Sequence, residues 1–365
     1  MKLLIFTAYY YPHAGGVENY VHELFKGMDV TVVTCNTEGA KPFERIHGFK
    51  VYRFDCYHLM NNTYPVLKYS SLKKIDQLVS QGGFDYIVTN TRFFHTSLIG
   101  VRAGLKYHIP VIHFEHGTQH SPIKNPLLHL LGVWYDHTIG RYIVKNATTA
   151  VGISHASEQF IKHLYNRKTF CVYNGVDTAL FKKKKTALKK KLGITGPVII
   201  FVGRLIYAKG VQDLLEAARG LDMTVIVIGD GPYRKTLEET YPWAKFVGAK
   251  NSSEIAEYLS IADIFVNPSY AEGLPTSVLE AGSSGVCCIA TDVGGTKEII
   301  THLVNGYLIK PQDAEGLRKH IVTLLNDKKL RDKFSKRLQL KIRKEFDWKV
   351  GQKKLRELLS RNRNT

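Results

Sequence analysis

The chain has 365 residues, 44% of them hydrophobic, which is enough to form two domains with separate cores. Its 51 Lys and Arg residues outnumber 32 Asp and Glu residues, and the formal net charge of +19 favours anionic partners: nucleotide phosphates, nucleic acid or an anionic membrane surface. The five cysteines lack CxxC or metal-ligand spacing and no apolar run approaches the roughly 20 residues of a membrane span, so we expect a cytoplasmic protein that does not cross a membrane.

Short apolar runs alternate with segments of helical periodicity along the first half of the chain. The strand-like runs are KLLIFTA directly after Met1, then DVTVVT, KVYRF, DYIVTN, PVIHFEHG and TAVGIS. This alternation predicts a parallel, doubly wound sheet. The pattern breaks at KKKKTALKKKLG, residues 182–193, which we interpret as a linker or a short solvated helix.

A second series of strands and helices follows the lysine-rich stretch. Its strand-like runs are PVIIFVGRL, MTVIVIGDG, KFVGA, DIFVNPS and VCCIATD. The sequence therefore predicts an α/β chain of two Rossmann-like domains with parallel sheets that face each other across a cleft. We expect a first domain over 1–173, a hinge over 174–195, a second domain over 196–340, and a C-terminal helix over 341–365 that could pack back on the first domain.

Two cations follow the first strand of the second series. The strand ends near Val202, Gly203 lets the backbone turn, and Arg204 and Lys209 come next. Ligands of open α/β sheets bind beyond the carboxyl ends of the strands, so these cations could hold a diphosphate. The alternative is that both are solvated surface residues.

The stretch YAEGLPTSVLEAGSSG, residues 270–285, holds two glutamates eight positions apart. Pro275 is typical of a first helical turn, so we expect a helix to about Ala281. Glu280, inside this helix, can accept hydrogen bonds from ribose hydroxyls, and Glu272 precedes the helix, where a sugar joined to the phosphates would lie. The alternative is one exposed loop acid and one amphipathic-helix acid. Unpaired N–H groups at the helix start make an anion site, those of Thr276, Ser277 and Val278.

This stretch resembles the E-x7-E signature of the retaining glycosyltransferases of family 4, which have the GT-B fold. The similarity extends from about residue 5 to residue 310. It includes GGVE after the first strand, NGVD at the family's hinge, GRLIYAKG at its diphosphate clamp, GDGP, ADIFVNPS, DVGGTKEII and NGYLI. The ordered agreement of these motifs makes the resemblance specific.

The resemblance implies a role for each matching residue. Gly16 would approach the donor diphosphate from the first domain, where a side chain would block it. Arg204 and Lys209 would neutralise the leaving group, Glu272 would contact the transferred sugar, and Glu280 would bind the ribose. The complete donor-binding set that we expect is Gly16, Gly203, Arg204, Lys209, Gly231, Gly273, Leu274, Thr276, Ser277, Val278 and Glu280.

The resemblance also implies a catalytic set of His116, Glu272, Arg204 and Lys209. His116 follows the strand PVIHFE and occupies the position of the family's active-site histidine. The alternative for His116 is a structural histidine, because the chain has 15 histidines and His113 and His120 lie close by.

The implied reaction is a retaining transfer of a hexosyl group from a UDP-, GDP- or ADP-sugar. The acceptor would be a saccharide or a lipid-linked molecule in cell-surface polysaccharide, lipopolysaccharide, glycolipid or glycan assembly. The alternative is a soluble enzyme that acts on a small sugar or polyol. No DxD motif and no metal-ligand spacing is present, so we expect neither a catalytic metal nor another cofactor.

The segment over residues 121–148 is unusually apolar and aromatic for a helical stretch. We interpret it as a core helix. The alternative is that it lies on an anionic membrane, on the inner face of which the basic chain would be peripheral. A nucleic-acid partner is disfavoured because no RNP, zinc or helix-turn-helix signature accompanies the charge. An epimerase or a phosphorylase is disfavoured by the E-x7-E loop and by the lack of a recognisable lysine motif for pyridoxal phosphate.

Overall fold

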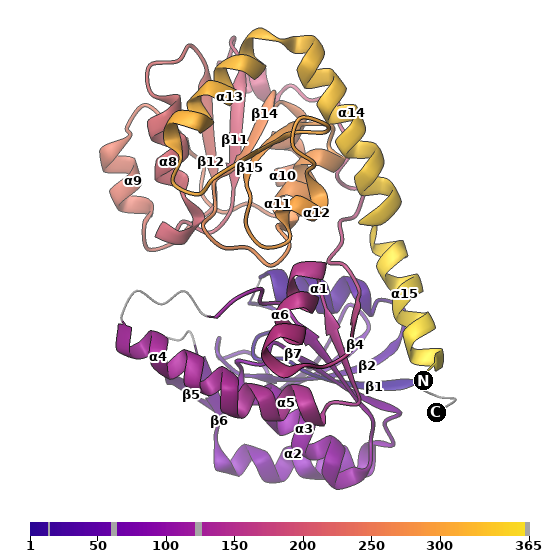
Figure 1. Cartoon of the computed structure of the whole chain (residues 1–365). Coiled ribbons are helices and arrows are strands. Elements are labelled where there is room, and N and C mark those ends of the chain that lie inside the picture. The colour runs from indigo at the N-terminus through magenta and orange to yellow at the C-terminus, as the bar shows by residue number, and fades with distance from the viewer. Residues whose placement is uncertain (14, 60–63, 121–125, 362–365) are drawn as a thin grey trace. The chain divides into compact units, whose positions relative to one another are not determined.

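The computed structural model describes residues 1–13, 15–59, 64–120 and 126–361. The chain forms two compact units (Figure 1). The first contains residues 1–173 and the chain from Gln352 onward, and the second contains Asn174–Gly351. Each unit is an α/β structure around its own sheet, as the alternation of strands and helices predicts.

The first unit is built on an eight-stranded sheet with the order β10-β9-β8-β7-β1-β2-β4-β3. All neighbouring strands are parallel except β3 and β4. The strands are β1 (Lys2–Phe6), β2 (Asp29–Cys35), β3 (Phe43–Ile46), β4 (Phe49–Phe54), β7 (Tyr86–Asn90), β8 (Val111–Glu115), β9 (Thr149–Gly152) and β10 (Thr169–Cys171); β5 (Cys56–Leu59) and β6 (Tyr64–Leu67) form a separate antiparallel pair.

Helices pack on this sheet, and its central strands are buried on both sides, as is typical of parallel sheets. One side is covered by α2, α3 and α5, whose residues Ile75, Val101 and Ile143 join a common core with the strands. Elsewhere, the ring of Tyr20 on α1 packs edge-on against Phe114 of β8. The helices of this unit are α1 (Gly16–Leu24), α2 (Tyr69–Gly82), α3 (His95–Tyr107), α4 (Pro126–Tyr135), α5 (Arg141–Asn146) and α6 (His155–Tyr165).

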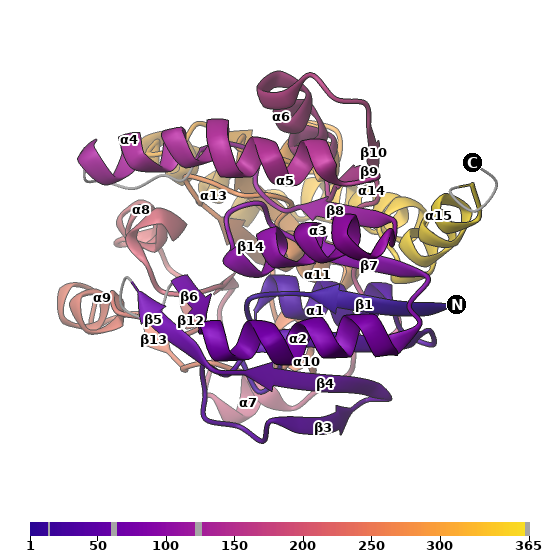
Figure 2. The same cartoon turned by 90° about the horizontal axis from the view of Figure 1, so that it is seen from below.

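A single turn of π-helix, η1 (Asp136–Gly140), joins α4 to α5, so the three form one nearly continuous helical stretch (Figure 2). No residue of α4 is buried. The prediction of a core helix is therefore wrong for residues 126–135, although it holds for α5, where Ile143 and Val144 are fully buried. Residues 121–125, which the same prediction covered, lie outside the described residues.

The second unit has a six-stranded, all-parallel sheet with the order β13-β12-β11-β14-β15-β16. Its strands are β11 (Val198–Val202), β12 (Thr224–Ile228), β13 (Lys245–Phe246), β14 (Ile264–Asn267), β15 (Cys287–Thr291) and β16 (Tyr307–Ile309). Its helices are α7 (Leu188–Lys191), the 3-10 turn η2 (Tyr207–Lys209), α8 (Val211–Ala218), α9 (Arg234–Thr240), α10 (Ser252–Ser260), α11 (Thr276–Ser283), α12 (Thr296–Ile299), α13 (Ala314–Asn326) and α14 (Lys328–Glu345).

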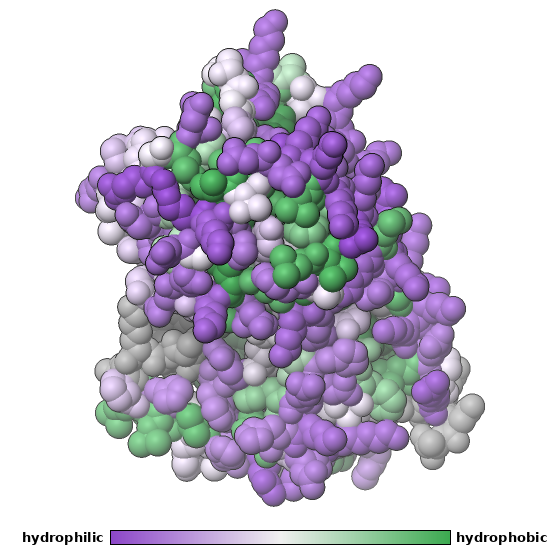
Figure 3. Space-filling view, turned by 45° about the horizontal axis from the view of Figure 1, so that its top comes forward, coloured by the Kyte–Doolittle hydropathy of each residue, from purple (hydrophilic) through white to green (hydrophobic). Residues whose placement is uncertain are grey.

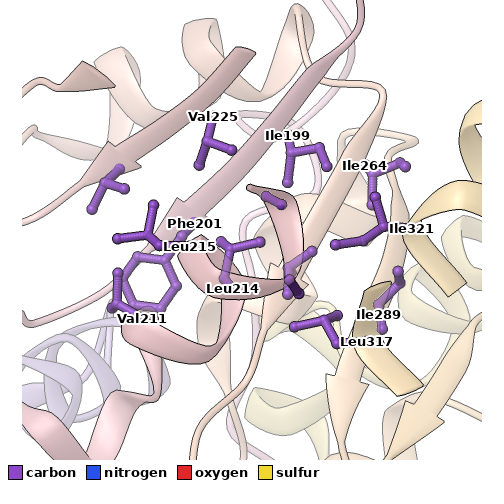
Figure 4. Close-up of a cluster of buried hydrophobic side chains, with 14 of the residues drawn as sticks. Ile199, Phe201, Val211, Leu214, Leu215, Val225, Ile264, Ile289, Leu317 and Ile321 are labelled. Carbon is purple, nitrogen blue, oxygen red and sulfur yellow. The ribbon is translucent and has the colours of Figure 1, made fainter. Parts of the chain in front are cut away.

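The core of the second unit lies between its sheet and the helices α8 and α13. Figure 4 shows Ile199 and Ile264 of the sheet pointing toward Leu214 of α8 and Ile321 of α13. On another part of the sheet, Gly282 of α11 lets α14 approach closely, because a Cβ at Gly282 would lie 2.5 Å from Ile342. This packing fixes α11, which follows the predicted acid loop.

The chain passes between the units twice, and the segments of the second unit next to the two passages are paired with each other. Val176 donates its N–H to the carbonyl of Phe346 (2.9 Å), and Trp348 donates to the carbonyl of Val176 (3.3 Å). The last helix, α15 (Trp348–Arg361), starts there and belongs to the first unit from Gln352 onward. The expected start of a C-terminal helix at residue 341 instead falls within α14.

Candidate functional site

The loops after β11 and β14 lie where the strand order of the second unit reverses. The chain builds outward from β11 in one direction through β12 and in the other through β14. Such a switch point is the usual ligand position in open α/β sheets. Gly203 and Arg204 directly follow β11, and Glu272 lies in the loop after β14, so the two predicted motifs meet at this edge of the sheet.

Lys209 and Glu272 form an ion pair across these two loops. The Lys209 Nζ lies 2.7 Å from the Glu272 Oε1, and the side chains are 28% and 11% exposed. The amide of Asn267, the last residue of β14, donates to the same Glu272 oxygen at 3.4 Å. The cation expected to bind the diphosphate and the acid expected to bind the sugar are therefore held together by direct contact.

Further contacts fix the two loops to each other. Tyr270 donates its N–H to the carbonyl of Ala208 (2.8 Å) and its hydroxyl to Asp213 on α8 (3.0 Å). Gly210 has a φ of +65°, and a Cβ there would lie 2.0 Å from the carbonyl oxygen of Pro268. Only glycine fits this close approach without strain.

The turn after β12 packs on the backbone of the β11 loop. Gly229 has a φ of +142°, and a Cβ there would lie 1.9 Å from the carbonyl oxygen of Gly203. Gly231 has a φ of +156°, and its Cβ would lie 2.4 Å from the carbonyl oxygen of Leu205. The glycines of the GDGP turn thus shape the loop that carries Arg204.

Arg204 differs from Lys209 in its surroundings. Its side chain is exposed, and its guanidinium makes no ion pair with any residue that the structure describes. The five N–H donors of this guanidinium are therefore available to an anionic ligand.

Helix α11 begins one residue later than the sequence predicts. Pro275 is its N-cap residue, and the helix runs from Thr276 to Ser283. Leu274, which precedes the N-cap, is buried. The N–H of Val278 already bonds the carbonyl of Pro275 (3.2 Å), which leaves the N–H groups of Thr276 and Ser277 as the first-turn donors that have no backbone partner among the described residues. Gly273, just before the helix, accepts from the N–H of Gly295 (2.9 Å).

Glu280 lies one turn inside α11, where its side chain is half-buried. Among the described residues no group donates to its carboxylate. Burial raises the pKa of Glu280 to about 8. At neutral pH the carboxyl group is therefore largely uncharged, so it can both donate to and accept from hydroxyls without repelling an anionic ligand.

Two predicted residues, Gly16 and His116, belong to the first unit. Gly16 is the first residue of α1 and has an ordinary backbone conformation, and a Cβ there would meet no atom within 4 Å. Packing within the protein therefore does not require glycine at this position.

His116 follows β8, one residue after the buried Glu115. Its Nε2 lies 3.3 Å from the Asn90 Oδ1, and the Tyr20 ring packs against it edge-on at 5.0 Å. Burial lowers the pKa of His116 to about 4, so the imidazole is neutral at physiological pH. It can exchange hydrogen bonds with a ligand but brings no positive charge.

Several residues that hold these sites together were not predicted from the sequence. Asn267 supports Glu272, and Tyr270 ties two loops, as described above. In the first unit, Arg92 forms ion pairs with both Glu115 and Asp136. The available signal was a polar residue at the end of a buried strand, as Asn267 is, or just beyond one, as Arg92 is; the partners of Arg92 are distant in sequence.

Two features are absent from the part of the chain that the structure describes. Within residues 1–13, 15–59, 64–120 and 126–361, no group of three or more His, Cys, Asp or Glu side chains could hold a metal ion. In the same ranges, no helix combines the length and the hydropathy that a membrane span requires.

Two family models match the chain, one for each unit. The model described as Glycosyltransferase Family 4 matches residues 14–180, and the model described as Glycosyl transferases group 1 matches residues 184–341. An uncharacterized glycosyltransferase of Methanocaldococcus jannaschii is 30% identical over 400 residues, which cover 99% of this chain and 98% of that protein.

Solved structures match the whole chain at lower identity. Sucrose-phosphate synthase of Thermosynechococcus elongatus has a TM-score of 0.82 at 20% identity and covers 99% of this chain and 98% of that chain. HepE of Anabaena, in complex with UDP-glucose, has a TM-score of 0.80 at 22% identity and covers 99% of both chains. The two parallel-sheet Rossmann-like units thus define a protein of the GT-B class. Within that class, the chain belongs to the family 4 glycosyltransferases, glycosyl transferases group 1.

Proposed function

We propose that this chain transfers a hexosyl group from a nucleotide-diphosphate sugar to a saccharide or lipid-linked acceptor, with retention of the anomeric configuration. The observation that carries this proposal is the 2.7 Å ion pair of Lys209 and Glu272 at the switch point of the second unit. With Arg204 and the first turn of α11, this pair provides cationic groups for a diphosphate and a carboxylate for the attached sugar. The complex of HepE with UDP-glucose supports the nucleotide-sugar class of donor.

The expected chemistry is the stabilisation of a departing diphosphate. Cleavage of the sugar–phosphate bond leaves negative charge on the phosphate oxygens and positive charge at the anomeric carbon. Arg204, Lys209 and the N–H groups of α11 would stabilise the negative charge, which is the task that a divalent cation performs in other sites. We therefore propose a reaction that needs no metal. The departing phosphate would accept the proton of the acceptor hydroxyl as the acceptor attacks from the same face.

Glu272 and His116 are proposed to contact the reacting sugar. Lys209 neutralises Glu272 from one side, so its carboxylate is suited to hold sugar hydroxyls rather than to attack carbon. His116 would offer a neutral imidazole near the reacting centre. A covalent glycosyl adduct on Glu272, trapped and identified by mass spectrometry, would contradict this assignment.

The acceptor class is proposed from α4. Four of its large apolar side chains are exposed at helical spacing, Leu127, Leu130, Leu131 and Trp134, at 53–66%. Figure 3 shows apolar side chains gathered at the lower left, where Figure 1 places α4. We propose that these side chains contact a lipid bilayer. Such a contact favours a lipid-linked acceptor in cell-surface glycan assembly.

Nucleotide release from a panel of UDP-, GDP- and ADP-sugars tests the proposed reaction. One donor should be hydrolysed slowly without acceptor, and Arg204→Ala and Lys209→Ala should each lower kcat about 100- to 1,000-fold, since each removes a stabilising charge. Glu280→Ala should mainly raise the Kd for the nucleotide. Lys235→Ala is the matched control because Lys235 is 88% exposed on α9. Turnover within twofold of wild type in both cation variants would contradict the proposal.

A further inference from the structure

Arg92 is a buried cation held between two buried carboxylates in the first unit. Its Nη1 lies 2.9 Å from the Glu115 Oε1, and its Nε and Nη2 bond the two oxygens of Asp136 at 2.8 and 2.9 Å. The exposed fractions of the three residues are 5%, 0% and 2%. The guanidinium also lies 4.7 Å from the ring centroid of Phe160. Charges removed so completely from water need every partner they have.

These charges are bonded to the backbone of the loop that carries His116. The Glu115 Oε1 accepts from the N–H of Gly117 (2.7 Å), and the Arg92 Nη2 donates to the carbonyl of Gln119 (3.3 Å). The Nδ1 of His120 lies 2.6 Å from the Asp136 Oδ2. Gly117, Gln119 and His120, which follow His116, therefore all bond to the cluster of Arg92, Glu115 and Asp136. Glu115, which directly precedes His116, is itself part of this cluster.

The local backbone leaves space for this arrangement. A Cβ at Gly117 would lie 3.0 Å from the Arg92 Nη1, and one at Gly140 would lie 3.4 Å from the Arg92 Cδ and 2.9 Å from the Tyr165 hydroxyl. Asp136 is the first residue of the π turn, an element that often marks functional sites. Thr91, directly before Arg92, has a φ of +63°, which is unusual for a β-branched residue.

A buried ion pair does not by itself stabilise a fold more than apolar packing of the same volume. What this cluster supplies is geometry, because bidentate and branched contacts from one guanidinium fix the loop in a single position. We propose that Arg92 is a positioning residue for glycosyl transfer: through Glu115 and Asp136 it holds the loop 115–120 so that the His116 imidazole stays at the reacting centre. This inference rests on the proposed function.

The test uses the full chain with Arg92→Lys and Asp136→Asn. Lysine keeps the charge but cannot form the branched contacts, and asparagine keeps the shape but loses the charge. Both should retain a cooperative melting transition. In both, amide hydrogen exchange in residues 116–120 should be at least tenfold faster than in wild type. With the best donor, kcat should fall at least tenfold while the donor KM changes less than threefold, because the proposed donor contacts lie in the other unit.

Arg167→Lys is the matched control, since Arg167 also fixes backbone of the first unit but bonds the carbonyls of Val144 and Thr148 instead. It should leave both kcat and exchange in 116–120 within twofold of wild type. The proposal is overturned if either Arg92→Lys or Asp136→Asn folds with unchanged exchange or with unchanged kcat. An Arg92→Lys chain that does not fold leaves the decision to Asp136→Asn.

The behaviour of the wild type also separates the failure of this inference from the failure of the proposed function. If the wild type releases no nucleotide from any donor, the reaction is wrong, and the loop is judged by exchange and by NMR titration of His116. An ordered loop in the wild type that loosens in both variants, with a rise in the pKa of His116, supports the positioning role. No change in either quantity rejects it.

Discussion

Glu280 is an acidic residue whose carboxyl group is largely protonated at neutral pH. It is half-buried on α11, with a pKa raised by burial to about 8, compared with about 4.3 in an unfolded chain. Because the folded state binds a proton more tightly than the unfolded state, the contribution of Glu280 to stability is full below the unfolded pKa. It is lost as the pH rises through the interval between the two values.

Replacement of Glu280 by glutamine should therefore change the pH dependence of stability. At pH 4 and below the Glu280→Gln variant should match wild type, and by pH 9 it should be the more stable protein. The difference should grow by at most about 1.4 kcal/mol per pH unit between the two pKa values. Urea unfolding at a series of pH values measures it. Glu239→Gln, at a position that is 66% exposed, serves as the control. A constant difference from pH 5 to pH 9 would refute the raised pKa.

Helix α4 is the element whose surroundings the sequence analysis misjudged. Between residues 126 and 146 the only acid is Asp136, which is buried, whereas Arg141 and Lys145 are exposed. The apolar helix is thus followed by cations with no exposed acid, a pattern that suits an anionic bilayer. A second copy of the chain would need only an apolar surface opposite α4, so a contact between copies would not account for the exposed cations beside the helix.

Replacement of two α4 leucines should weaken membrane binding without loss of stability. Leu130 and Leu131 are 64% and 53% exposed, so serine at both positions should leave the melting temperature within 1–2 °C. Each leucine taken out of water contributes about 1.5–3 kcal/mol, so the double variant should bind vesicles at least tenfold more weakly. Flotation with phosphatidylglycerol and phosphatidylcholine vesicles at low and high salt measures this.

The matched control for α4 is Leu340→Ser, because Leu340 is 67% exposed on α14 of the other unit. This variant should bind vesicles as wild type does. Equal binding by the Leu130/Leu131 variant would remove α4 as the contact. A wild type that binds no acidic vesicle but dimerises through α4 in sedimentation would replace the bilayer with a second copy.

At the scale of the whole molecule, the C-terminal helix joins the two units covalently a second time. Its residues Leu355 and Leu359 are fully buried, and the Tyr86 hydroxyl donates to the carbonyl of Leu359 (3.1 Å). Gln352 donates from its side chain to the carbonyl of Glu23 at 2.8 Å. The first unit thus needs the end of the chain to complete its own packing.

Leu359→Ala should therefore destabilise the first unit although residue 359 is far from it in sequence. Truncation of a fully buried leucine costs about 2–5 kcal/mol. The exposed neighbour Arg356 provides the control, since Arg356→Ala should change the free energy of unfolding by less than about 0.5 kcal/mol. The free energies of unfolding of the two variants are compared by urea denaturation, and the local stability of β7 and α1 is compared by amide hydrogen exchange. Equal stability of both variants would show that α15 is not part of the first unit's core.

The alternation of strands and helices, the two-unit α/β class, and the loops that carry Arg204, Lys209, Glu272 and Glu280 could all be predicted from the amino-acid sequence. These features depend on local patterns in the chain, namely the periodicity of apolar residues, glycine at turns and proline at a helix start. The positions of Lys209 and Glu272 could be predicted separately, but not their contact, which joins residues 63 apart.

Which apolar faces are covered, and which charged side chains meet, depends on how the complete chain packs. Periodicity shows that a helix has an apolar face but not what lies against it, because hydrophobic attraction has no direction; the apolar face of α4 is exposed while that of α15 is buried. Arg92 meets Glu115 and Asp136, which lie 23 and 44 residues away, only because two neighbouring strands end, and a π turn begins, at one place. The pKa values of Glu280 and His116 likewise follow from burial, which the complete fold produces.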